Sequence, residues 1–167
     1  MGPALQIVII VFCIIFSAYF SATETAFSTF NRIRVKNMAE KGNKKAARVL
    51  ALSDNFDTLI STILIGNNLV NILSTSLATI LFIDIFNDES IGTTISTVVM
   101  TVLVLIFGEI TPKTLAKKRP EAFAIFSAPL INAILIILPP FSFIFKAWQT
   151  LISKILKKEE EEDGEAD

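Results

Sequence analysis

The sequence predicts an all-α membrane protein with three transmembrane helices, juxtamembrane amphipathic helices and a re-entrant or interfacial helical hairpin. Two observations predict the membrane class. Hydrophobic residues make up 52% of the 167 residues and charged residues only 19%, with a mean hydropathy of +0.61, which is too little charge for the surface of a soluble domain. The charges also gather in short patches that separate long uncharged runs.

Four uncharged runs are candidate membrane helices. They extend from the N-terminus to Thr23, from Thr58 to Ile83, from Ile91 to Gly108 and from Ala122 to Phe145. Each approaches or exceeds the roughly 18 apolar residues that indicate a transmembrane helix. The first run lacks a basic leader and is too long for the core of a signal peptide, so we interpret it as a retained span.

The charged patches between these runs predict the topology. Residues 32–48 are rich in Lys and Arg, with Glu40 as the only acid, and residues 113–119 are basic as well. The turn between the second and third runs carries only acids, from Asp84 to Glu89. The positive-inside rule therefore places both basic segments in the cytoplasm and the acidic turn outside. The N-terminus is expected outside and the C-terminus in the cytoplasm of a multi-pass protein of the cell (plasma) membrane.

The fourth run, Ala122–Phe145, is expected not to cross. A full crossing would place Lys154, Lys157 and Lys158 outside, against the basic bias. Pro129 and Pro139-Pro140 are also expected to interrupt the helix. A re-entrant or interfacial hairpin that turns near Pro139-Pro140 explains both facts, and a fourth full span is the alternative. Residues 1–155 then form a transmembrane ion-transport domain, and residues 156–167 form an acidic tail or the start of a linker.

Composition narrows the function. The chain has no histidine and one cysteine, Cys13, inside an apolar run, so catalytic triads, zinc sites and disulfide frameworks are not expected. The formal net charge of −1 gives no reason to expect a nucleic-acid partner. We therefore expect a protein that is not an enzyme and whose first partner is the lipid bilayer. The basic segment 32–48 is expected to form amphipathic helices on the anionic inner leaflet.

Glu109 is the first candidate site residue, because an ionisable residue in a span is a functional hypothesis by default. It follows Gly108 near the cytoplasmic end of the third run. Pro112 cannot donate a hydrogen bond to the carbonyl of Gly108, which leaves a free acceptor beside the carboxylate. This combination favours a cation. The alternative is a boundary carboxylate paired with Lys113.

Asn67 and Asn71 form a second candidate feature in the second run. They are four residues apart and therefore share one helix face, which Ser74 extends, whereas Asn68 lies about 100° away. Their amide oxygens can be metal ligands. The alternative is interhelical hydrogen bonding, the usual role of asparagine in membranes.

The end of the first run contributes Ser21 and Glu24. A hydroxyl such as that of Ser21 often bonds the preceding turn, and Glu24 is expected to pair with the region of Arg32 and Arg34. Together, three spans supply hydroxyl, amide and carboxylate oxygens. That set suits a hard cation such as magnesium, sodium or calcium, and not zinc or copper.

Three motifs carry a family resemblance. Residues 20–26 (FSATETA), 66–71 (GNNLVN) and 108–113 (GEITPK) resemble, in order and spacing, the membrane domain of the CorC/CorB and CNNM magnesium transporters. The resemblance implies a homodimer and a magnesium ion held by Ser21, Asn67, Asn71 and Glu109. Four side chains leave two octahedral positions, for which the carbonyl of Ser21 is the first candidate and those of Gly66 and Gly108 are weaker ones.

The resemblance also implies the function: magnesium export driven by sodium as the coupling ion. Family members usually continue into cytosolic regulatory domains, which are absent from this chain. The alternative function is a magnesium-binding membrane anchor or sensor that dimerises such modules. A channel is less favoured, because residues 7–15 of the first span contain no polar stripe.

Overall fold

The computed structural model describes residues 2–137, 147–148 and 150–153, and within these residues the chain is helical with no strand. The helices are α1 (Pro3–Thr29), α2 (Arg32–Glu40), α3 (Lys44–Ser53), α4 (Phe56–Phe86), α5 (Glu89–Leu103), the π-helix η1 (Val104–Ile110), α6 (Thr111–Lys118) and α7 (Pro120–Ile137). This confirms the all-α membrane class. The predicted acidic tail, residues 156–167, and the predicted turn at Pro139-Pro140 lie outside the described residues.

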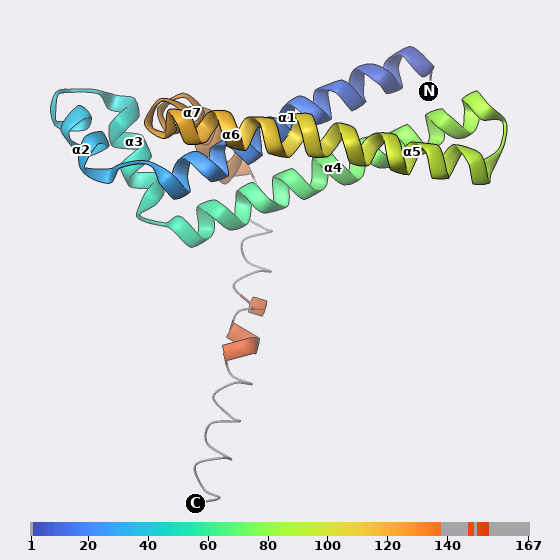
Figure 1. Cartoon of the computed structure of the whole chain (residues 1–167). Helices are drawn as coiled ribbons and strands as arrows, with labels where there is room; N and C mark the ends of the chain where they lie inside the picture. The colour runs from blue at the N-terminus through green and yellow to red at the C-terminus, as the bar shows by residue number, and fades with distance from the viewer. Residues whose placement is uncertain (1, 138–146, 149, 154–167) are drawn as a thin grey trace, which may run out of the picture.

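Three long helical segments form the membrane bundle (Figure 1). They are α1, α4 and the continuous helix that α5, η1 and α6 build from Glu89 to Lys118. The chain reverses direction at Asn87, which ends α4 in the left-handed conformation (φ 51°), and Asp88 then caps α5 by accepting a hydrogen bond from the amide of Ile91 at 2.8 Å. The bundle therefore has an acidic end at this turn and a basic end on the opposite side.

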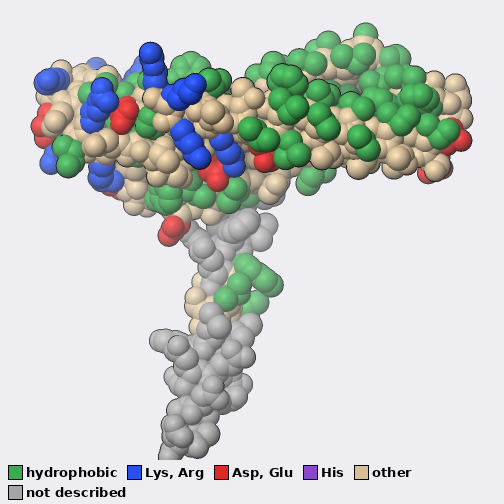
Figure 2. Space-filling view, in the orientation of Figure 1, with side chains coloured by type: hydrophobic (Ala, Val, Ile, Leu, Met, Phe, Trp, Pro, Cys, Tyr) green, Lys and Arg blue, Asp and Glu red, His purple; other side chains and the backbone are tan. Residues whose placement is uncertain are grey.

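The basic end is built by α2 and α3. Asn31 and Asn43 cap the two helices, each through its side-chain oxygen, as the preference for asparagine at this position predicts. On α3, Ala46, Val49 and Leu52 are buried at helical spacing, while the lysines and Arg48 stay exposed. The lysines and arginines gather over this end of the molecule, and hydrophobic side chains cover the other half (Figure 2).

Four described helices, and not the expected three, are long and apolar enough to cross a membrane. The additional one is α7, which runs without a break through Pro129. The expected interruption at Pro129 is therefore wrong. Proline removes one backbone hydrogen bond from a helix, but packing against neighbouring helices can sustain the helix at such a point. Ser127, Ala128 and Ile131 around this proline are all buried in the core.

Both ends of α7 nevertheless lie beside elements of the basic end. Near its start, Glu121 accepts a hydrogen bond from the amide of Asn31 at 3.1 Å. Near its other end, Asn132 and Leu135 line a groove together with Arg48 of α3. A helix whose two ends meet the same end of the bundle does not run along the length of that bundle.

We therefore expect a reporter fused after Lys158 to behave as cytoplasmic. The reason is that α7 starts and ends at the basic end, which the positive-inside rule assigns to the cytoplasm. Paired alkaline phosphatase and green fluorescent protein fusions measure this. A matched fusion in the acidic turn after Asp88 should report the outside. External activity of the Lys158 fusion would mean four spans and would make the re-entrant interpretation wrong.

Candidate functional site

The candidate site lies where α1, α4 and η1 meet inside the bundle. Ser17 of α1 is fully buried, and its hydroxyl donates a hydrogen bond to the side-chain oxygen of Asn67 on α4 at 2.9 Å. The site of a Cβ added to Gly108 of η1 would lie only 2.8 Å from the same Ser17 oxygen. Three helices thus bring polar groups together in one buried place, and the absence of a side chain at Gly108 permits this approach.

Asn67 and Asn71 contact each other on one face of α4, as their spacing predicts. The Asn71 amide nitrogen donates to Asn67 Oδ1 at 3.4 Å. Ser74, one turn further, is buried and donates to the carbonyl of Asn71. Asn68 is exposed, in agreement with its different helical angle. The stripe Asn67–Asn71–Ser74 therefore faces the interior and Asn68 does not.

Two side-chain oxygens of the predicted ligands are buried and have no hydrogen-bond partner among the described residues. They are Ser21 Oγ on α1 and Asn71 Oδ1 on α4. Buried polar atoms are almost always satisfied, and leaving one unpaired costs about 1–3 kcal/mol. The alternative role of the Ser21 hydroxyl, a hydrogen bond back to the preceding turn, is not formed. Both atoms are good ligands for a hard cation, and a bound cation would satisfy them.

Glu109 lies on η1, directly after Gly108, and is half-buried. The alternative interpretation paired it with Lys113, but Lys113 Nζ lies 3.3 Å from Glu24 Oε2 instead. Within the described part of the chain, no cation and no hydrogen-bond donor contacts the Glu109 carboxylate. Its charge is therefore available to a ligand. No hydrogen bond joins Glu109 or Ser21 to the two asparagines among the described residues.

The observed pair also corrects the expectation for Glu24. We expected this carboxylate to pair with the region of Arg32 and Arg34. Arg32 instead pairs with Asp54, and Arg34 lies 3.9 Å from Glu121. Glu24 contacts Lys113 because α1 packs along α6. This packing brings together two charged side chains that lie on different helices. Residues that are neighbours along the sequence do not indicate such a contact.

Gly66, a weaker candidate, is buried at the contact of α4 with α1. A Cβ there would lie 2.5 Å from the Phe20 ring, so the aromatic side chain packs directly on the α4 backbone. This contact holds α1 and α4 together one residue before Asn67. Close backbone approach at small residues is the usual way in which membrane helices associate.

Ser17 was not among the residues predicted from the sequence. The signal was present, because Ser17 and Ser21 are four residues apart and share a face of α1. Serine is common in membrane helices, however, and only the contact with Asn67 distinguishes Ser17 from the others. No group of three or more acidic, histidine or cysteine side chains that could hold a metal ion occurs among the described residues. A cation site here must rely on neutral oxygens and one carboxylate.

Membrane-length helices around a buried group of unpaired oxygens define a multi-pass, all-α membrane domain with a polar site between its spans. The chain belongs to the CNNM family: residues 8–166 match the family described as the cyclin M transmembrane N-terminal domain. This confirms the resemblance inferred from the three motifs.

Relatives agree with the assignment. The chain is 41% identical over 140 residues to the UPF0053 inner membrane protein YfjD of Escherichia coli, which covers 84% of this chain and 32% of that protein. It is 35% identical over 149 residues to a UPF0053 protein of Haemophilus influenzae, covering 89% of this chain and 35% of that protein. The polyamine export protein of Salmonella typhimurium is 27% identical over 165 residues, covering 92% and 37%. The chain spans about a third of the length of these relatives.

Proposed function

We propose that this domain transports magnesium ions across the membrane, as an exporter driven by sodium entry. The observation that carries the proposal is the pair of buried, unpartnered oxygens, Ser21 Oγ and Asn71 Oδ1, in a region where the helices of a membrane bundle meet. A buried oxygen without a hydrogen-bond partner raises the free energy of the folded protein, and a cation that binds to it would lower that free energy again.

The ligands in this proposal are Ser21, Asn67, Asn71 and Glu109, with the carbonyl of Ser21 and, more weakly, those of Gly66 and Gly108 completing the octahedron. Hydroxyl, amide and carboxylate oxygens suit magnesium, which is a hard cation. The sodium coupling and the direction rest on the family. We also propose that the domain works as a homodimer in the plasma membrane, with cytosolic regulatory domains in the remainder of a longer protein.

One carboxylate leaves a divalent ion with a net charge of +1 in a medium of low dielectric constant. Such an excess lowers affinity unless nearby dipoles compensate for it. Weak binding is compatible with transport, because a transported ion must leave the site. The π-helix η1 supports this role: π-helical turns are rare and occur mostly at functional sites, where they alter the backbone hydrogen bonding.

A second candidate function is a membrane anchor and magnesium sensor. The observation that favours it is length, because the chain covers only about a third of its relatives. In this alternative the same oxygens hold magnesium structurally and stabilise a dimer that presents cytosolic modules. Ion flux separates the two functions, since a sensor binds magnesium and transports none.

We expect Asn67→Ala and Asn71→Ala to weaken magnesium binding about tenfold or more, and Asn68→Ala to leave it nearly unchanged. Asn67 and Asn71 contact each other on the face of α4 that meets Ser17 of α1, whereas Asn68 is exposed. Calorimetric titration of the purified protein with magnesium measures the affinities, and Asn68→Ala is the matched control. Because one relative is named as a polyamine exporter, spermidine is titrated in parallel. Equal losses for all three variants would instead assign these amides to helix packing.

A further inference from the structure

A groove of about 450 Å³ opens at the basic end, where the end of α3, the start of α4 and α7 meet. Its polar lining comes from Arg48 on α3, Asn55 in the turn, Thr58 on α4 and Asn132 on α7. None of these residues belongs to the candidate cation site. The groove is therefore separate from the candidate cation site.

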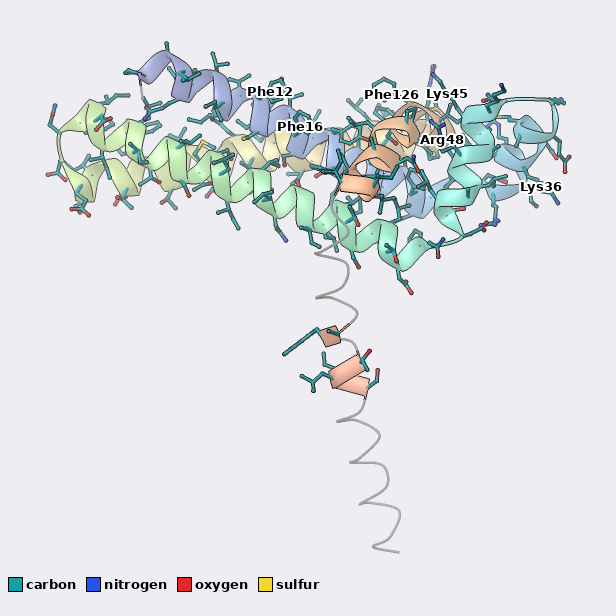
Figure 3. The ribbon with its side chains drawn as sticks, turned by 180° about the vertical axis from the view of Figure 1, so that it is seen from behind. Phe12, Phe16, Lys36, Lys45, Arg48 and Phe126 are labelled. Atoms are coloured by element: carbon teal, nitrogen blue, oxygen red, sulfur yellow. The ribbon has the colours of Figure 1, made fainter. Side chains whose placement is uncertain are left out.

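Arg48 is the charged group of the groove. Two other arginines of the basic segment have carboxylate partners, Arg32 with Asp54 and Arg34 with Glu121. Arg48 has none among the described residues, and it lies on α3 next to α7 (Figure 3). An unpaired guanidinium is the preferred protein group for phosphate, which it can bind with two parallel hydrogen bonds.

Asn132 is the second indication of a ligand. It interrupts the apolar surface of α7, is half-buried, and forms no hydrogen bond to another described residue. Asparagine within a membrane helix normally bonds to a neighbouring helix, because an unsatisfied amide is costly there. Its amide can donate to a phosphate oxygen, and so can the Asn55 amide and the Thr58 hydroxyl.

The rest of the groove is apolar. Leu52 and Leu59 are buried at its floor, and Leu135 of α7 forms part of its wall. A polar mouth with one positive charge above an aliphatic floor is complementary to an amphiphile with an anionic head. It is less suited to a free anion, which would leave the aliphatic floor exposed to water.

We propose that this groove binds one anionic phospholipid of the membrane leaflet at the basic end. Its phosphate contacts Arg48 and Asn132, and the start of an acyl chain covers Leu52, Leu59 and Leu135. The surrounding lysines and arginines concentrate anionic lipids at this end, and the groove then selects one of them. The lipid fastens α7 to α3 and α4, whose residues form the groove.

The test measures the thermal unfolding midpoint of delipidated protein in an uncharged detergent, titrated with phosphatidylglycerol. Phosphatidylcholine and soluble glycerol phosphate are the comparison ligands. We expect phosphatidylglycerol alone to raise the midpoint. Arg48→Gln should shift the lipid titration about tenfold to higher concentration, the effect of losing a charge-assisted hydrogen bond. Lys45→Gln removes the same charge from an exposed position of α3 outside the groove and is the matched control.

A second variant, Asn132→Leu, keeps the charge and removes the amide, and native mass spectrometry counts the lipid that stays bound to each protein. Retained phosphatidylglycerol should fall in Arg48→Gln and Asn132→Leu and persist in Lys45→Gln. Equal losses in Arg48→Gln and Lys45→Gln would reduce the effect to general surface charge and overturn the proposal. The proposal also fails if glycerol phosphate reproduces the shift, or if wild type does not respond to phosphatidylglycerol.

Discussion

Glu109→Gln is expected to abolish magnesium flux while the protein remains folded. The carboxylate is the only full charge among the proposed ligands, so its loss leaves a divalent ion with neutral oxygens alone. We expect a loss of roughly 100-fold or more, since changes even to groups that merely orient metal ligands cost 10–100-fold. Folding should persist, because Lys113 pairs with Glu24 and does not depend on Glu109.

The measurement uses proteoliposomes that contain a magnesium dye, with an imposed sodium gradient. Glu24→Gln is the matched control, because it makes the same chemical change on another half-buried carboxylate at the same end of the bundle. That variant breaks a partly exposed ion pair worth about 0–1 kcal/mol and should keep its flux. Full flux in Glu109→Gln would remove the site assignment. Absence of flux in wild type would favour the sensor, or a requirement for the remainder of the longer protein.

Gly92→Ala is expected to lower stability most among simple glycine substitutions outside the site. An added Cβ would lie 2.6 Å from the Cα of Ile83 and 2.7 Å from its backbone nitrogen. The obstacle is backbone, so α4 and α5 must separate near the acidic turn to admit the methyl group. Overpacking of this kind costs about 1–3 kcal/mol.

The unfolding midpoint in detergent measures this effect. Gly2→Ala serves as the control, because nothing lies within 4 Å of a Cβ at that position. The midpoint should fall clearly in Gly92→Ala and stay unchanged in Gly2→Ala. An unchanged midpoint in both variants would show that the α4–α5 contact opens at little cost.

The features that the sequence predicts well are those that depend on neighbours along the chain. The stripe of Asn67, Asn71 and Ser74 follows from the helical repeat. The membrane class follows from the composition. The errors concern contacts between distant segments. Glu24 pairs with Lys113 rather than with the region of Arg32 and Arg34, and Ser17 contacts Asn67, because helix packing decides both contacts.

The fourth membrane-length helix and the π-helix have a different cause. Proline was interpreted as a local break at Pro129, yet tertiary packing around Ser127 and Ile131 sustains the helix there. Gly108 and Pro112 did indicate disturbed backbone bonding near Glu109. That signal does not specify its outcome, and in the structure the continuous helix widens into η1 before α6 begins at Thr111, directly ahead of Pro112.

The acceptor role of Asn67 Oδ1 has a consequence for how the proposed cation site would load and empty. This atom already receives two donors, the Ser17 hydroxyl and the Asn71 amide. A cation that binds this oxygen must displace both donors. Loading would therefore exchange two hydrogen bonds for one metal–oxygen contact, at the cost of the hydrogen-bond energy. A divalent ion of high charge density compensates for the lost hydrogen-bond energy more fully than a monovalent ion does. In the proposed transport cycle, the same two donors compete with the ion for this oxygen, and this competition lowers the affinity of the site and favours release of the ion.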